Sequence, residues 1–264
     1  MWRRRLTSSC TRRRPEVCGK FETIAAAGEP PSVKQPAITF GMTQADQGYS
    51  ILPGVFVPAE MIAVTRGLSG NTPQRSKAGA RHVLSVPVVR DLSADPRLLA
   101  IASQFVGAAA VPFRATLFDK SPTANWLVVW HQDTALPLRE RFERDDWGPW
   151  SAKAGILYAH APASALEQII ALRVSLDDSL LTNGPLRVLP GTHRGGVYTD
   201  EQIERLAQNT APVDCVTPSG GVIAMRPLTV HASSKSTDSQ PRRVLHIEYA
   251  ATVNLDSGIE LAVA

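Results

Sequence analysis

The sequence is poor in cysteine and has no long apolar run. Its 264 residues include three cysteines, Cys10, Cys18 and Cys215, which are too few and too far apart for a disulfide framework. This usage fits a reducing compartment, and we expect a cytoplasmic protein. No apolar stretch approaches the roughly 18 residues of a membrane-spanning helix, so we expect no membrane partner. With 44% hydrophobic and 20% charged residues, the composition excludes a wholly disordered or fibrous chain.

The excess of positive charge is confined to one end of the chain. The formal net charge is +4, but residues 1–20 contain seven Lys and Arg and a single Glu. The remainder therefore has 21 basic and 23 acidic residues, a net charge of −2. Because that remainder is slightly acidic, its charge gives no indication of a basic nucleic-acid groove, and we expect no nucleic-acid partner.

Three interpretations of the basic N-terminus remain open. An Arg-rich, acid-poor start is typical of an organelle transit peptide, which would make the protein organelle-targeted. It would also fit a basic interaction tail or a start codon placed too early. Residues 28–36 (GEPPSVKQP) have the composition of a linker, and Met42 opens a credible domain. We therefore predict a disordered or non-native extension over residues 1–41 and one domain over 42–264.

Helical signals come first in this domain and strand signals follow. Asp95 and Pro96 fit the N-cap and first position of a helix that ends near Gly107, and a shorter helix is expected over 59–66. From residue 112, short runs rich in β-branched and aromatic residues alternate with turn sequences. One further helix is expected after Thr199, whose spacing to Gln202 is that of a capping box. The order indicates an α+β fold with a β-sandwich or barrel.

The sequence WHQDT at 130–134 is the first sign of a metal site. Side chains alternate along a strand, so His131 and Asp133 would project to the same side, as would Asn125 if the strand is regular. Two histidines and one carboxylate on one face form the triad of non-haem Fe(II) oxygenases. An H-x-D sequence alone is weak support for such a site, because it arises often by chance.

The triad needs a third ligand from elsewhere in the chain. The candidates are five histidines: His82, His160, His193, His231 and His246. His231 is the best of them, because it follows an apolar strand sequence at a polar turn. Arg242 follows 11 residues later, and a guanidinium can grip the distal carboxylate of an oxo-acid cosubstrate with a planar fork.

Three segments carry a family resemblance. They are NWLVVWHQD (125–133), LRVSLDDSLLTNGPLRVLPGTHRGG (172–196) and MRPLTVHASSKSTDSQPRRVLHIEYA (225–250). With these ordered motifs the chain resembles the phytanoyl-CoA dioxygenase family of Fe(II)/2-oxoglutarate-dependent oxygenases, especially a bacterial branch of unassigned substrate. The resemblance implies a double-stranded β-helix, a jelly-roll or cupin-like core, flanked by helices. It also implies Fe(II), the cosubstrate 2-oxoglutarate and O2.

The same resemblance implies roles for individual residues. Fe(II) would be held by His131, Asp133 and His231. Arg242 would bind the C5 carboxylate of 2-oxoglutarate, with Ser233 as a helper. The neighbouring Arg243 is an alternative to Arg242, because strand alternation does not show which face lines the barrel. The family usually has glycine after the distal histidine, where this chain has Ala232. Related halogenases lack the carboxylate ligand, so Asp133 favours hydroxylation.

Several other polar residues have two interpretations each. Asn125 would contact the 2-oxoglutarate C1 carboxylate, or only form a structural hydrogen bond. The charged segment 139–150 would form a lid over the metal that selects substrate, or a solvated loop. The structural role is preferred for Lys120 as a solvated edge residue, for His193 and His246, and for Asp177 and Asp178 in a turn. Trp126 and Trp130 are expected to pack outside the barrel.

The leading functional prediction is an oxygenase that hydroxylates a small molecule and releases succinate and CO2. One alternative is a non-catalytic jelly roll that binds a metal or ligand; the presence of the triad and the arginine argues against it. A second is a member that modifies nucleic acid or peptide, which the charge distribution disfavours. A third is an acyl-CoA hydroxylase, although no basic cluster marks a site for the CoA phosphates.

Overall fold

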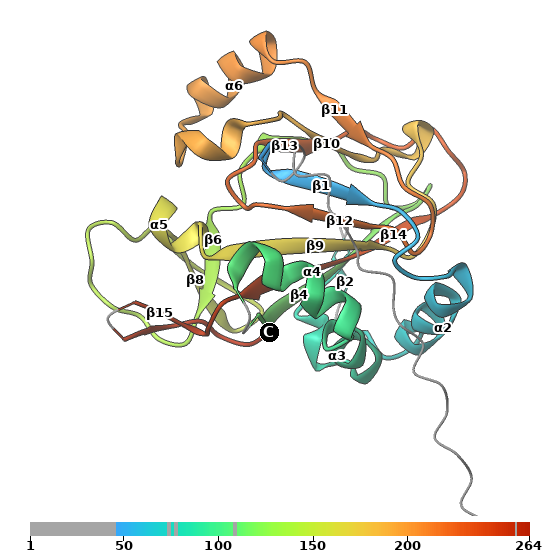
Figure 1. Ribbon diagram of the computed structural model, residues 1–264, viewed down its shortest axis with the longest axis horizontal. Helices are drawn as coiled ribbons and strands as arrows, with labels where there is room; N and C mark the ends of the chain where they lie inside the picture. The colour runs from blue at the N-terminus through green and yellow to red at the C-terminus, as the bar shows by residue number, and fades with distance from the viewer. Residues whose placement is uncertain (1–45, 73–74, 77–78, 108–109, 257) are drawn as a thin grey trace, which may run out of the picture. The chain divides into compact units, whose positions relative to one another are not determined.

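The computed structural model describes residues 46–72, 75–76, 79–107, 110–256 and 258–264 (Figure 1). All of them belong to one compact unit, Ile38–Ala264. The predicted extension over residues 1–41 lies outside the described residues, and so do Cys10 and Cys18. Cys215 is a free, buried thiol. Within the described ranges, no helix has the length and apolarity needed to cross a membrane.

The largest sheet has seven strands, and every neighbouring pair in it is antiparallel. In spatial order they are β1 (Tyr49–Leu52), β12 (Val222–Met225), β9 (Ile169–Ser175), β14 (Arg242–Ala250), β4 (Val111–Lys120), β3 (Gly79–Arg81) and β2 (Arg75–Ser76). The long central strands β9, β14 and β4 come from distant parts of the sequence. Their side chains therefore bring together residues that no local motif connects.

Three smaller sheets complete the β-structure of the described residues. The second sheet is also antiparallel, in the order β11 (Val213–Cys215), β10 (Leu186–Val188), β13 (His231–Ser233) and β5 (Val128–His131). A third contains β6 (Ala135–Leu138), β8 (Ile156–His160) and β7 (Trp150–Lys153), and the fourth pairs β15 (Asn254–Asp256) with β16 (Ile259–Glu260). These antiparallel sheets with a few helices confirm the predicted α+β class and suit a jelly-roll core.

The three predicted helices begin close to their expected positions, whereas α3 and α5 were not predicted. They are α2 (Pro58–Leu68), α3 (Pro87–Ser93), α4 (Pro96–Val106), the short α5 (Ala163–Leu166) and α6 (Asp200–Asn209), with 3-10 turns η1 (Val83–Ser85), η2 (Leu181–Asn183) and η3 (Thr192–Gly195). The Asp95 carboxylate accepts a hydrogen bond from the Arg97 amide, and the capping box of Thr199 and Gln202 is present. Both predicted helix starts are therefore confirmed.

Alternation along β14 decides which side chains face the site. Leu245, Ile247 and Tyr249 belong to the apolar cluster that also contains buried residues of α2, α3 and α4, so these helices cover that face of the large sheet (Figure 1). Arg242, Val244, His246 and Glu248 must then point to the other face, because successive side chains of a strand alternate. The sequence left this choice open, and the packing of the helices resolves it.

Candidate functional site

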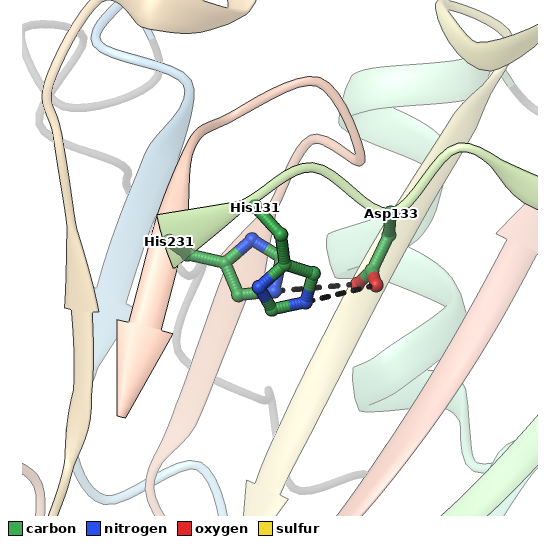
Figure 2. A group of neighbouring side chains, drawn as sticks. All are labelled: His131, Asp133 and His231. Atoms are coloured by element: carbon green, nitrogen blue, oxygen red, sulfur yellow. Dashed lines mark ion pairs between the residues drawn. The ribbon is translucent and has the colours of Figure 1, made fainter. Parts of the chain in front are cut away.

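Two histidines meet across neighbouring strands of the second sheet. His131, the last residue of β5, is the direct partner of His231, the first residue of β13, and their ring centroids are 4.2 Å apart. Asp133 lies two residues beyond β5, where its amide donates to the Pro227 carbonyl. Its carboxylate oxygens lie 3.6 Å from His131 Nε2 and 3.5 Å from His231 Nε2 (Figure 2).

Both imidazoles are oriented by the backbone carbonyl two residues before them. His131 Nδ1 lies 2.8 Å from the Val129 carbonyl oxygen, and His231 Nδ1 lies 2.9 Å from that of Thr229. A proton on Nδ1 satisfies both contacts and leaves each Nε2 as a lone-pair donor. The three facing atoms lie within 4.8 Å of one another, which suits ligands around one metal ion.

Burial shifts the pKa values of all three side chains in this cluster. Burial raises the pKa of Asp133, but the two histidines outweigh it and hold that pKa well below its usual range. Burial lowers the pKa of His231 to about 3. Burial also lowers the pKa of His131, although its bond to Asp133 outweighs this and raises it. At neutral pH the cluster therefore offers a carboxylate and a neutral His231, as a metal site requires.

A small cavity of about 110 Å³ adjoins the three side chains and is rich in positive charge. Its lining includes Lys120, Arg173 and Arg242, all of which are buried. Lys120 was predicted to be a solvated edge residue, and this is wrong: only 1% of it is exposed, and its ammonium donates to Ser233 Oγ at 2.6 Å and to the Ser234 carbonyl. Arg173 Nη1 lies 3.0 Å from His246 Nδ1.

The two tryptophans near β5 lie in different environments. Trp126 lines the small cavity, so the prediction that it packs outside the barrel is wrong. The strand begins only at Val128, and strict alternation does not extend back to residue 126. Trp130 packs beside Ile203 of α6 and Val230, outside the barrel as predicted.

Neighbouring arginines of β14 have different surroundings. Arg242 is 3% exposed, lines the small cavity, and its Nε has no hydrogen-bond partner. Burial and the charge of Arg173 lower its pKa to about 9. The Arg243 guanidinium instead donates two bonds to the Asp177 carboxylate, at 2.7 and 2.8 Å. Arg242 therefore has an unused donor at the cavity, while Arg243 is committed elsewhere.

The two predicted helper residues also differ. Ser233 lines the small cavity, where its hydroxyl donates to the Gly184 carbonyl and accepts from Lys120. Asn125 is not among the residues that line this cavity. Its carboxamide bonds in both directions with the backbone of Ser236, at 2.7 and 2.8 Å. The structure thus gives Asn125 the structural hydrogen bond that was its second interpretation.

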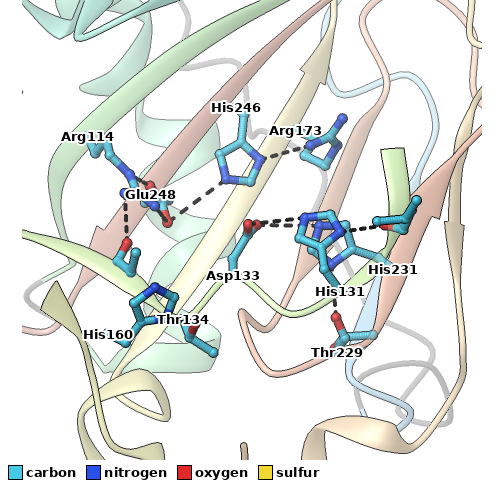
Figure 3. A network of polar contacts seen from close by, with 12 residues as sticks. Arg114, His131, Asp133, Thr134, His160, Arg173, Thr229, His231, His246 and Glu248 are labelled. Carbon is cyan, nitrogen blue, oxygen red and sulfur yellow. Dashed lines mark hydrogen bonds and ion pairs between the residues drawn. The ribbon is translucent and has the colours of Figure 1, made fainter. Parts of the chain in front are cut away.

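A second, larger cavity lies on the other side of Asp133 and is mostly polar. It has a volume of about 280 Å³, and Asp133 and Phe118 line both cavities. Arg114 and Glu248 form a buried ion pair beside it, and His246 lies between Glu248 and Arg173 (Figure 3). The rest of its lining includes Arg81, Thr116, Gln132, Thr134, Lys153, Tyr158 and His160.

Four of the five candidate histidines do not join the cluster. His82 Nε2 lies 2.7 Å from the Tyr158 hydroxyl, His160 Nδ1 lies 2.6 Å from the Thr134 hydroxyl, and His246 contacts Arg173. His193 lies in the turn η3. His231 is therefore the histidine that the fold brings to His131 and Asp133.

The structure does not support the lid that was one of the two interpretations of the segment 139–150. None of its residues lines either cavity beside Asp133. Trp147 is buried in an apolar cluster with Leu136 and Leu261, and Arg139 forms an ion pair with Glu260. The aromatic part of the segment is committed to this packing and contributes nothing to the lining of the two cavities.

Sequence reasoning missed Arg114, Arg173 and Glu248. Each lies in a short, mainly apolar run, in FRATLF, IIALRVSL and VLHIEYA respectively. Charged residues are rarely buried without a partner, so a charge in such a run was the signal that could have found them. What the sequence could not show is that β4, β9 and β14 are adjacent.

The chain is similar to several proteins of known structure or activity. It is 25% identical over 187 residues to L-proline trans-4-hydroxylase from Streptomyces griseoviridis, which covers 60% of this chain and 61% of that relative. EctD from S. alaskensis, crystallised with 2-oxoglutarate and 5-hydroxyectoine, matches at a TM-score of 0.63 with 19% identity, over 85% of this chain and 81% of EctD. The α-ketoglutarate-dependent carbocyclase SnoK from nogalamycin biosynthesis matches at a TM-score of 0.59 with 19% identity, over 84% of this chain and 87% of SnoK.

These structural matches show a shared fold, which is the jelly-roll core predicted from the sequence. A family model spans residues 45–244, more than half of the chain, and contains all three clustered ligand candidates. The chain belongs to the phytanoyl-CoA dioxygenase (PhyH) family.

Proposed function

We propose that this protein is an Fe(II)- and 2-oxoglutarate-dependent oxygenase that hydroxylates a C–H bond of a small molecule. The observation that carries the proposal is the convergence of His131, Asp133 and His231 beside a cavity lined by three buried cations. A metal site next to a pocket for a small dianion is what this chemistry needs. The family, and relatives that bind or depend on 2-oxoglutarate, support the same reaction class.

The donor set fits Fe(II). Two neutral imidazole nitrogens and one carboxylate oxygen on one side of a metal leave its remaining positions open for cosubstrate and O2. The backbone bonds at both Nδ1 atoms present Nε2 as the ligand atom. We assign His131, Asp133 and His231 as the ligands.

The small cavity fits 2-oxoglutarate. Arg242 Nε is a buried donor without a partner, and such an atom is costly unless a ligand satisfies it. Lys120 and Arg173 add positive charge to the same lining. A carboxylate there would offset the desolvation of these cations and form charge-assisted hydrogen bonds. We assign Arg242 as the anchor of the distal carboxylate, with Lys120 beside it and Ser233 positioning Lys120.

The residues of the chain have three tasks in the reaction. The bound metal, with 2-oxoglutarate and O2, would supply the oxidising power for hydroxylation, with succinate and CO2 as coproducts. The triad holds the metal, and Arg242 with Lys120 orients the cosubstrate. Burial of His231 and Arg242 keeps this side of the site dry. The polar cavity on the other side of Asp133 leaves room for the substrate.

Two alternatives have less support. A non-catalytic metal-binding protein would not need the buried arginine and lysine beside the triad. An acyl-CoA hydroxylase would need an apolar channel at the metal, but the cavity there is lined mainly by polar side chains. The similarity to a hydroxylase named for L-proline also favours a small polar substrate.

Anaerobic titration tests the proposal. Adding Fe(II) and then 2-oxoglutarate to the protein should produce the weak visible charge-transfer band of the iron chelate and raise the thermal unfolding temperature. The His231→Ala variant should show neither change, because it loses one ligand. If the wild-type protein gives no band and no 2-oxoglutarate-dependent stabilisation, the proposed function is wrong.

A further inference from the structure

The polar cavity beside Asp133 is lined by three positive side chains from three different strands. Arg81 ends β3, Arg114 lies in β4 and Lys153 ends β7. Glu248 lies against Arg114, and Asp133 is the carboxylate in the lining itself. The balance of these charges decides which ligand the cavity favours.

Two of the five charges cancel inside the protein. The Arg114 guanidinium donates to both carboxylate oxygens of Glu248, at 2.5 Å to Oε1, and also to the Ala135 carbonyl at 3.0 Å. Glu248 is 1% exposed. This ion pair is complete and buried, so Arg114 is held in place and is not available to bind a ligand with its full charge. In the proposed function, Asp133 is likewise neutralised by the metal.

Arg81 and Lys153 have no such partner. No ion pair joins either of them to a carboxylate of the described residues, and none of the hydrogen bonds found there involves their side chains. Lys153 Nζ instead lies 4.7 Å from the centre of the Tyr158 ring. Partial burial lowers the pKa of Lys153, and so do the charges of Arg81 and Arg114. The charge of Asp133 opposes this lowering, but it forms no ion pair with Lys153, so two like charges are held beside one cavity with no carboxylate in direct contact.

These two side chains stand where the polar cavity meets a wider one. The wider cavity, of about 1110 Å³, is lined by Arg81 and Lys153 together with apolar residues such as Leu84 and Ile156. A ligand that enters the polar cavity from this side passes both cations. Its reacting part would then lie toward Asp133, and its charged part would lie at the junction.

We propose that the substrate is a small anion, whose carboxylate or phosphate group is bound by Arg81 and Lys153 at this junction. The inference rests on the proposed function, because that function places the reacting end of the substrate at the metal. Anion binding by Arg81 and Lys153 can nevertheless be measured without turnover. An anion there would supply the missing counterion and receive bonds from a guanidinium and an ammonium. Neutral molecules of the same shape would leave both cations unpaired.

The test is a binding screen under anaerobic conditions with Fe(II) and saturating 2-oxoglutarate. Because 2-oxoglutarate then occupies the small cavity, the acids in the screen cannot bind there. The probes are of two kinds. Small carboxylic acids and amino acids are each compared with the primary amide, and small monophosphate esters are each compared with the parent alcohol. We expect calorimetry to detect one charged class and not its neutral counterparts. The dissociation constant of that class should rise about tenfold in Lys153→Met and in Arg81→Met, and further with salt.

Arg205→Met is the matched control, since it removes one positive charge from the exposed face of α6. It should bind the anion as the wild type does. Equal binding of acids and amides, unchanged affinity in both cavity variants, or no binding by any probe would overturn the proposal. Arg81 is exposed at a strand end, so Arg81→Met remains informative if Lys153→Met does not fold. If the iron band is absent, the proposed oxygenase function fails, and the same screen without metal still measures the anion site.

Discussion

His131 and His231 are direct partners across the antiparallel strands β5 and β13, 100 positions apart in the sequence, with ring centroids 4.2 Å apart. The backbone hydrogen bonds of the sheet therefore set the spacing of the two imidazoles. Asp133 is brought to them by the turn after β5, where its amide bonds to the Pro227 carbonyl. The three side chains are brought together by backbone hydrogen bonds alone, and such preorganisation favours tight binding by limiting the ordering that a metal must impose.

Removing either imidazole should abolish metal binding. His131→Ala and His231→Ala each leave two ligands, so we expect iron bound per protein to fall from about one to near zero after gel filtration. Elemental analysis and the charge-transfer band provide the measurement. His193→Ala is the control, because His193 lies in the turn η3, outside the cluster. Retention of stoichiometric iron by His231→Ala would contradict the assignment.

Much of this site could be predicted from residue patterns, and the missing parts have a physical reason. The H-x-D spacing identifies His131 and Asp133 as a pair, although β5 ends at His131 and Asp133 lies beyond the strand in which it was expected. Asp95 and Thr199 mark helix starts through local hydrogen bonds. Local rules fail where long-range packing decides. Lys120 looks like a strand-edge residue in sequence, but it is the direct partner of Arg242 in β14, and its ammonium is buried against Ser233 and Ser234.

The assignment of Arg242, and not Arg243, as the anchor of 2-oxoglutarate gives a second prediction. Arg242→Met should weaken 2-oxoglutarate binding by about 10- to 100-fold, because a charge-assisted bond to a buried carboxylate contributes roughly 1.5–3 kcal/mol. Iron binding should change little. Arg243→Met removes the bonds to Asp177 and should leave the affinity for 2-oxoglutarate near the wild-type value. Calorimetric titration measures the affinity of both variants for 2-oxoglutarate. If Arg243→Met weakens binding and Arg242→Met does not, Arg243 is the anchor.

Lys120 should make 2-oxoglutarate binding depend on pH. Burial, together with the charges of Arg242 and Arg173, lowers its pKa to about 7. The ammonium form predominates below that pKa and attracts the dianion, so affinity should fall as the pH rises from about 6 to 8. The Arg242 pKa, near 9, lies above this window.

The measurement is the dissociation constant of 2-oxoglutarate across this range, at saturating iron so that the histidine ligands stay neutral. Lys120→Met should bind more weakly and show a flat profile, because it cannot titrate. Arg66→Met removes an exposed charge from α2 and should keep the wild-type slope. A wild-type profile that is already flat would show that Lys120 does not contact the cosubstrate.

Removal of residues 1–41 should leave the domain intact. The family match begins at residue 45 and the first strand begins at Tyr49, so the apolar clusters of the described fold are built from later residues. We expect the truncated protein to unfold at the same urea midpoint as the full chain and to bind the same amount of iron. An insoluble or unfolded product would show that the first 41 residues belong to the domain.

Removing only one member of the Arg114–Glu248 ion pair should lower the free energy of unfolding. Arg114→Met leaves the Glu248 carboxylate buried without its partner, and loss of one member of a buried pair typically destabilises a protein by about 3–5 kcal/mol. The double variant Arg114→Met with Glu248→Met removes both charges and should recover most of that loss, since matched apolar replacements are often nearly neutral. Urea denaturation of the single and double variants measures the coupling. If the double variant is as unstable as Arg114→Met alone, the packing of Arg114, and not its charge, stabilises the fold at this point.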